Sequence, residues 1–250
     1  MEGFKAAFIN EIDKLYRRKK ALVIVILSLV MIVFGQLAII GLRSGLGLRG
    51  TSSTEFPILV LSVLVNTLLP LFVALIAADI FTGEFSQNTM KLSLMRPVTR
   101  LKLYSAKVAA IGIFALANLL IVMVLSTIAG FLFNTSTATA SGLVKVVLSY
   151  LISLLPIMVL ALGIVLLANI FRSGTTVFFL SILLFILSKA VGIVFSQYSS
   201  LLITSMMGWY GLWIADPMPF GKILRLFIIM AGYAIMFFTA GFYLFDKRDL

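Results

Sequence analysis

The chain has 250 residues, of which 62% are hydrophobic and only 12% are charged, and its mean hydropathy is +1.17. Soluble domains carry about 25% charged residues, so a water-soluble fold could not bury this much apolar surface, and most of the chain needs lipid as its solvent. The absence of Cys and His excludes thiolate nucleophiles, disulfides, imidazole bases and His-ligated metals.

The net charge of +11 lies mostly at the ends of apolar runs. A nucleic-acid-binding domain would gather its basic residues on one face of a soluble fold, whereas clusters beside apolar runs set orientation in a membrane. We therefore expect a lipid bilayer, and no nucleic acid, as the partner of these charges.

Residues 1–20 precede the first long apolar run. Phe4, Phe8, Ile12 and Leu15 recur at helical spacing, with polar residues between them. This pattern is typical of a helix that lies in the membrane interface with its apolar face down. Periodicity alone allows a second interpretation, in which residues 1–20 simply extend the first span.

Six segments are long and apolar enough to cross a bilayer as helices, which takes about 20 residues. They are residues 21–42, 57–78, 108–133, 146–171, 174–195 and 226–245, and only the fifth contains a charge, that of Lys189. Pro70 and Pro156 are expected to kink their spans. The segments are too continuously apolar for the alternating strands of a membrane barrel.

Lys and Arg residues predict the orientation. With the N-terminus inside, fourteen of them fall on the cytosolic side and five on the outer side. This bias predicts that both termini are cytosolic.

Two loops have unusual compositions. Residues 79–107 mix charges and capping residues with Pro97, which predicts short cytosolic helices broken near Arg96. Residues 196–222 are apolar but broken, and they contain Trp209 and Trp213. They are expected to form re-entrant or interfacial helices, with the two Trp side chains acting either as headgroup anchors or as part of a gate.

Few polar residues interrupt the spans. Asn66, Asn118 and Lys189, with the two Trp residues of the outer loop, are the candidates for a substrate pathway. The alternative for the amides is that they join helices by hydrogen bonds. Lys189 is a functional candidate because it carries a charge inside a span, although it lies near the outer end and its ammonium can snorkel there.

The order of these features resembles the membrane subunit, or permease, of a type-2 ABC exporter over essentially the whole chain. An N-terminal helix ends in Leu-Tyr-Arg-Arg-Lys-Lys and leads into six spans. The loop between the second and third spans carries Glu84, Thr89 and the step Pro97-Val98-Thr99-Arg100. A Phe-Arg-Ser turn at 171–173 and the tail at 245–250 also match the family, whereas Asn88 stands where the family often has Gly.

The resemblance implies a cytosolic coupling helix within residues 79–107, placed at 83–94, that docks into a groove on an ATPase subunit. The residues it assigns to coupling are Gly83, Glu84, Asn88, Thr89, Leu94, Arg96 and Arg100. Glu84 can contact the ATPase, but it can equally cap a helix or pair with Arg96 or Arg100. Asn88 tolerates left-handed backbone geometry, so it preserves the turn.

The resemblance also implies partners. The chain has no Gly-x-x-x-x-Gly-Lys-[Ser/Thr] loop, so ATP and Mg would be bound by two ABC ATPase subunits, beside a second permease that is either a copy or a homologue. The expected function is export of a hydrophobic or amphipathic peptide antibiotic, toxin, drug or lipid from a bacterial cytoplasmic membrane. The alternatives are a secondary transporter, a channel or a peptide-sensing subunit; an enzyme is not expected, because no acid–base pair converges.

Overall fold

The computed structural model describes residues 2–16, 19–46, 52–86, 99–134, 139–171 and 173–247. The chain is 91% helical with no strands in these ranges. Its elements are α1 (Glu2–Tyr16), α2 (Lys19–Leu46), α3 (Glu55–Asn66), α4 (Leu68–Ser86), α6 (Arg100–Phe133), α7 (Ala140–Ile170), α8 (Gly174–Val194), the 3₁₀ helix η1 (Ser196–Leu201), α9 (Ile203–Met206), α10 (Tyr210–Ile214) and α11 (Phe220–Asp246).

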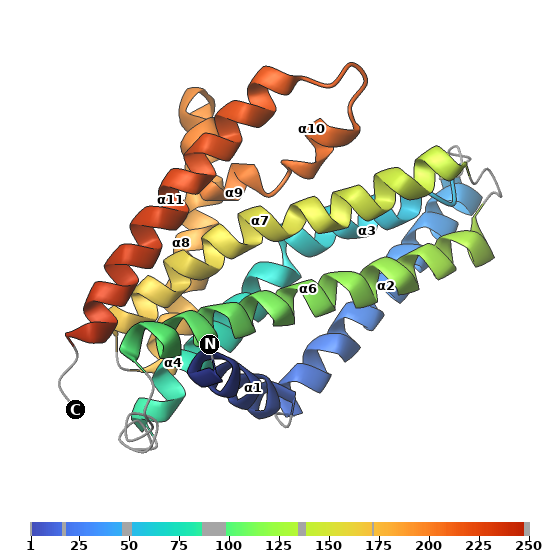
Figure 1. The fold of residues 1–250 in the computed structure, drawn as a ribbon. Helices are drawn as coiled ribbons and strands as arrows, with labels where there is room; N and C mark the ends of the chain where they lie inside the picture. The colour runs from blue at the N-terminus through green and yellow to red at the C-terminus, as the bar shows by residue number, and fades with distance from the viewer. Residues whose placement is uncertain are drawn as a thin grey trace.

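These elements form a tilted helical bundle with the N-terminal helix across one end (Figure 1). Within the described residues, α2, α6, α7, α8 and α11 are each long and apolar enough to cross a membrane, and α3 with α4 counts as a sixth, broken span. This confirms an all-α integral membrane protein. Several helices are longer than the predicted segments; α6, for example, begins at residue 100 instead of 108, because hydropathy marks the lipid-facing part of a helix and not its end.

The second span is broken between α3 and α4, which meet at an angle of 45°. Thr67 separates them, and Pro70 is the third residue of α4. Proline lacks an N–H and its ring collides with the carbonyl group four residues earlier, here that of Asn66, which favours a bend at this point. The kink predicted at Pro70 is therefore confirmed. Pro156 lies inside α7, and the kink expected there stays a prediction.

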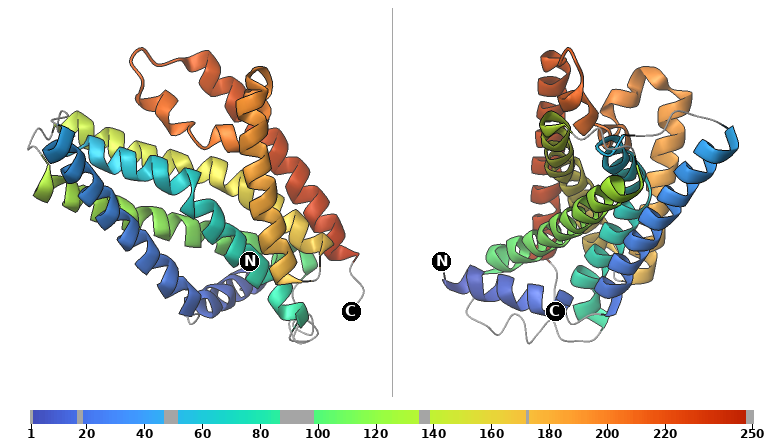
Figure 2. Two further views of the ribbon diagram at one scale, coloured as in Figure 1. Left: turned by 180° about the vertical axis from the view of Figure 1, so that it is seen from behind. Right: turned by 90° about the vertical axis from the view of Figure 1, so that its right-hand side faces the viewer.

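The N-terminal helix α1 forms an element separate from α2, and it packs against the first turns of α6. Phe4, Phe8 and Ile12 pack on the main core, and Leu15 is buried. The same face also buries Glu11, which is 2% exposed. Figure 2 shows α1 crossing the end of the bundle at a steep angle to the other helices, so it is not an extension of the first span.

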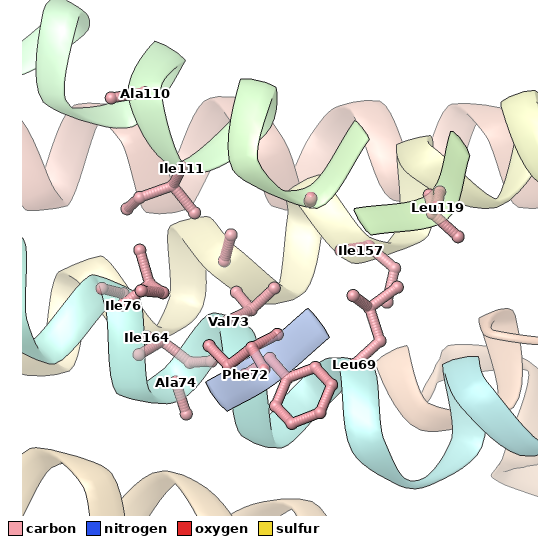
Figure 3. Close-up of a cluster of buried hydrophobic side chains, with 14 of the residues drawn as sticks. Leu69, Phe72, Val73, Ala74, Ile76, Ala110, Ile111, Leu119, Ile157 and Ile164 are labelled. Carbon is pink, nitrogen blue, oxygen red and sulfur yellow. The ribbon is translucent and has the colours of Figure 1, made fainter. Parts of the chain in front are cut away.

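The main core lies where α4, α6 and α7 meet. Figure 3 shows Leu69 and Val73 of α4 pointing toward Ile111 and Leu119 of α6 and Ile157 of α7, and all five side chains are fully buried. Small changes of side-chain volume are felt at such sites, because protein interiors are close-packed. These three helices therefore form the rigid centre against which the other spans are placed.

The spans α8 and α11 expose apolar surface. Only 11% of the most apolar window is buried in α8, and the same holds for α11, which is expected of helices that face lipid. Between them, η1, α9 and α10 are too short to span, as predicted for residues 196–222, and α9 and α10 pack against α7. Tyr233 of α11 donates a hydrogen bond to the carbonyl of Leu201 at 2.9 Å, which ties this loop to the last span.

Candidate coupling site and pathway residues

The segment predicted to couple the chain to an ATPase joins α4 to α6. Gly83 and Glu84 lie in the last turn of α4, and Arg100 is the first residue of α6. The other predicted coupling residues lie outside the described residues: Asn88, Thr89, Leu94 and Arg96. We call the end of the bundle where α4 ends and α6 begins the loop end; both α1 and the end of α11 lie there (Figure 1).

At the loop end, α1 is held to α6 and α4 by a buried ion pair. The ammonium nitrogen of Lys107 in α6 lies 3.6 Å from Glu11 Oε2, and the two side chains are 1% and 3% exposed. Lys107 also donates to the carbonyl of Ile80 in α4 at 3.1 Å, and Lys14 pairs with Glu11 at 2.9 Å. Buried charges are stable only when paired and hydrogen-bonded, so this cluster fixes the three helices relative to one another.

The first span is held to α4 by a second ion pair. Lys20, in the first turn of α2, donates to both carboxylate oxygens of Asp79, at 2.9 and 2.8 Å. The Lys20 side chain is half exposed, whereas that of Asp79 is 19% exposed. An exposed pair of this kind stabilises a fold by only about 0–1 kcal/mol, so its main effect is to define how α2 sits on α4.

The last span is held to α6 by Arg100. Its guanidinium lies 3.9 Å from a carboxylate oxygen of Asp246, and it also donates to the backbone carbonyl of Asp246. Asp246 is the last residue of α11, where free carbonyl groups and the helix dipole favour a cation. Arg100, which the sequence assigned to the coupling segment, therefore has a described partner within the chain.

An aromatic cluster joins α4, α6 and α11 about one turn of α6 beyond Arg100. The ring of Tyr104 in α6 contacts Phe81 of α4 at 5.7 Å between centroids and Phe238 of α11 at 5.1 Å. It also contacts Phe242 and Phe245. Edge-to-face and tilted ring contacts of this kind add about 0.5–1.5 kcal/mol each to the burial of the rings, so the cluster packs α4, α6 and α11 against one another.

The fifth span begins against α4. Gly174, the first residue of α8, lies so close to Thr82 that a Cβ there would be 2.7 Å from Thr82 Oγ1. Beside this contact is a pocket of about 630 Å³, the loop-end pocket. It is lined by Lys20, Leu75, Ala78, Asp79, Thr82, Ser173, Gly174, Thr175 and Phe178. The pocket thus lies between the ends of α2, α4 and α8.

Two predicted pathway residues lie together. The ammonium group of Lys189 in α8 donates a hydrogen bond to Asn66 Oδ1 at the end of α3, and it lies 5.8 Å from the centre of the Phe185 ring. The side-chain amide of Asn66 donates to the carbonyl of Ser62 at 2.9 Å. The structure therefore directs Lys189 toward the break in the second span.

Asn118 lies elsewhere. It is 2% exposed and donates to Ser28 Oγ of α2 at 3.2 Å, so in this structure it joins α6 to α2 as the helix-joining alternative predicts, and it does not line an open path. Burial of two polar side chains in the membrane costs less free energy when they hydrogen-bond to each other than when each faces lipid alone.

Trp209 and Trp213 lie together in the outer loop, apart from Lys189. Their rings meet edge to face at 5.4 Å, and both line an apolar pocket of about 450 Å³ between α7 and α11. Trp209 also stacks on Phe227 at 6.4 Å. The five predicted pathway residues therefore occupy three separate places.

Sequence reasoning did not predict Glu11 and Asp79 as partners of Lys107 and Lys20, which it counted among the cytosolic orientation charges. The signal for Glu11 was present, because it stands three residues after Phe8 and four before Leu15, on the apolar face of α1. Pairing across elements has no comparable signal in one sequence, since Lys20 and Asp79 lie far apart in the chain.

This combination defines a class of protein: a polytopic membrane protein whose spans are tied together around one loop between its second and third spans. The chain matches the family model of "ABC-2 family transporter protein" over residues 7–188, more than half of its length, and it belongs to that family. It is also 36% identical over 74 residues to "Uncharacterized protein YhcI" of Bacillus subtilis (strain 168), covering 29% of this chain and 24% of that protein. The match thus spans about a quarter of that relative's length.

Proposed function

We propose that this chain is the permease subunit of an ATP-driven exporter that moves a hydrophobic or amphipathic molecule (a peptide antibiotic or toxin, a drug or a lipid) out of a bacterial cytoplasmic membrane. Two ABC ATPase subunits bind ATP and Mg and dock at the loop end, with both termini of the permease cytosolic. A second permease chain, identical or homologous, completes the transporter.

The observation that carries this proposal is the arrangement of bonds at the loop end. Family membership supplies the ABC-2 permease class. Glu11–Lys107 ties α1 to α6, Lys20–Asp79 ties α2 to α4, and Arg100 ties α6 to the end of α11. Because α4 and α6 flank residues 87–98, a force applied to that loop reaches each of these helices. A rigid element of this kind is what an ATPase needs in order to move the spans.

The loop-end pocket is the proposed entrance for cargo. It lies between α2, α4 and α8, and α2 and α8 expose many apolar side chains, including Val33 at 55%, Leu37 at 58% and Leu187 at 50%. An apolar face that leads away from a polar entrance suits amphipathic cargo better than small ions. We propose that a second permease faces it, so that the pathway runs between the two chains.

The first experiment is purification of the tagged chain from its native host in mild detergent, with and without crosslinking, followed by mass spectrometry. A stoichiometric ATPase with a phosphate-binding loop is the expected companion. A homomeric chain without any ATPase after crosslinking would overturn the proposal in favour of a channel or secondary carrier. Peptide-stimulated ATP hydrolysis without movement of peptide would instead identify a sensing subunit.

The coupling assignment has its own test. The double variant Glu84→Ala/Thr89→Ala is compared with Asp13→Ala, which removes an exposed acidic side chain of α1. In proteoliposomes the double variant is expected to bind the ATPase more weakly and to lose transport while remaining folded. Unchanged transport in the double variant would remove 83–94 as the coupling helix.

A further inference from the structure

Lys189 is a charged residue near one end of the apolar span α8. It lies in α8, five residues before the helix ends at Val194, and its side chain is half-buried. A charged side chain costs about 2.5–3.5 kcal/mol at the centre of a membrane helix on insertion scales and less toward the helix end, where a lysine can snorkel. The partners of Lys189 therefore decide how its charge is used.

The described partners of Lys189 are neutral. Its ammonium donates to the amide oxygen of Asn66 and lies 5.8 Å from the ring of Phe185. Of the acidic side chains that the structure describes, none lies within 4.0 Å of it. An amide oxygen and a ring face lower the free-energy cost of the ammonium charge. Because both are neutral, they do not cancel the charge, and the site remains positive.

The break in the second span places two helix ends beside Lys189. Asn66 ends α3, and α4 starts at Leu68 with a 19-residue helix. The first N–H groups of a helix have no acceptor within it and carry a partial positive charge. Thr67, between the two helices, is exposed, so this start of α4 is accessible from the surface. The free carbonyl groups at the end of α3 carry the opposite partial charge, so the net positive charge at this point is that of Lys189.

The side chains around Lys189 and Asn66 are apolar and exposed. Leu59 and Val63, two turns and one turn before Thr67 on α3, are 47% and 50% exposed. On α8, Ile186 and Ile193, about one turn to either side of Lys189, are 58% and 82% exposed. A ligand here meets one positive point within an apolar face, which matches a molecule with one anionic group on an apolar body.

The same pair of helices, α4 and α8, also bounds the loop-end pocket. From Gly174 at that pocket to Lys189, α8 rises roughly 22 Å. The pocket and Lys189 therefore lie near opposite ends of α8. An amphiphile that moves along α8 from the pocket would reach Lys189.

We propose that Lys189 and Asn66 form an anion-recognition site for cargo, and that the transporter prefers amphiphiles with a phosphate or carboxylate over cationic ones. Lys189 pairs with the anion, and Asn66 holds the ammonium in place through its amide oxygen. This inference deepens the proposed function, on which it rests for the identity of the pathway.

The test uses the full chain without any ATPase, in nanodiscs of zwitterionic phosphatidylcholine. Binding of dodecyl phosphate and of dodecyltrimethylammonium, which share one alkyl chain and differ in charge, is measured by displacement of fluorescent dansylundecanoic acid. The variants are Lys189→Met, Lys189→Arg and Asn66→Ala, with Lys145→Met as the control, because Lys145 is exposed at the start of α7. Two further arms add free inorganic phosphate or nanodiscs containing phosphatidylglycerol.

The wild type and Lys145→Met are expected to prefer dodecyl phosphate by at least about tenfold, the range of one charge-assisted hydrogen bond. Lys189→Met is expected to lose this preference without a loss of thermal stability, and Lys189→Arg is expected to keep most of it. Competition by phosphatidylglycerol, but not by inorganic phosphate, assigns the site to membrane lipid headgroups; competition by both assigns it to phosphate in general.

Equal binding of the two amphiphiles by the wild type would overturn the inference. So would an unchanged preference in Lys189→Met, or a variant that melts lower yet keeps its preference, since either result makes Lys189 only a helix-joining residue. These outcomes leave the proposed function intact, because an ATPase partner is sought in a separate experiment.

Discussion

Replacement of Gly174 by Ala tests the contact between α4 and α8 directly. The new Cβ would lie 2.7 Å from Thr82 Oγ1, while the next atom of Thr82 is 3.9 Å away. Thr82 cannot turn aside freely, because its side chain is β-branched and its hydroxyl donates to the carbonyl of Ala78 at 2.6 Å. Overpacking of this kind costs about 1–3 kcal/mol, and 1 kcal/mol shifts the melting temperature of a chain this size by about 2–4 °C.

The assay is thermal unfolding in nanodiscs, followed by Trp fluorescence. Gly174→Ala is expected to melt several degrees lower than the wild type. Thr82→Ala alone should be close to neutral, since the Ala78 carbonyl keeps its helical hydrogen bond. The double variant Thr82→Ala/Gly174→Ala should recover most of the loss, because only the hydroxyl oxygen is in the way.

The matched control is Gly232→Ala in α11, where a Cβ meets no atom within 4 Å. It should be neutral, or stabilising by up to about 1 kcal/mol through helix propensity. If Gly174→Ala melts like the wild type, or if the losses of the two single variants simply add in the double variant, the packing of α8 on α4 described here is refuted.

Three further predictions concern the polar contacts that tie the helices. A double-mutant cycle of Glu11→Gln and Lys107→Met, measured by thermal unfolding, should give a coupling energy of about 0.5–3 kcal/mol; a value near zero would contradict the ion pair between α1 and α6. Lys20→Asp and Asp79→Lys should each lower transport by repulsion, and the charge-swapped double variant should restore most of it if the pair orients α2. Tyr150→Phe removes a buried hydroxyl that donates to α3 at 2.9 Å, so it should cost about 1–3 kcal/mol; an unchanged melting temperature would show that this bond is not made.

The sequence predicted an all-α membrane protein, because about 20 consecutive apolar residues leave a helix in lipid as the only stable state. It also predicted the break at Pro70, since proline acts through its own ring and the carbonyl four residues earlier. Both are local effects, and a local effect can be inferred from neighbouring residues alone. The short helices before the last span follow from the same length argument.

Partners across the bundle could not be inferred in this way. Lys107 and Lys20 carry the same charge beside the same kind of apolar run, so hydropathy and charge treat them alike. Only the packing of α1 on α6 buries Lys107 to 1% exposure beside Glu11, while Lys20 stays half exposed beside Asp79. A buried pair and an exposed pair differ in desolvation, which depends on what surrounds them and not on their positions in the chain.

The polar residues of the spans illustrate the same division. From the sequence, Asn66 and Asn118 are both single amides in apolar helices, and each can join helices or line a path. The tertiary structure separates them, because α6 turns Asn118 inward to α2 whereas the break at Thr67 leaves Asn66 beside Lys189. Composition thus determined that this chain is embedded in a membrane, because the free energies of transfer of its residues from water to lipid sum along the sequence. Which of its few polar groups face one another was decided only by the rotation of each helix about its axis, which packing against all the other helices sets.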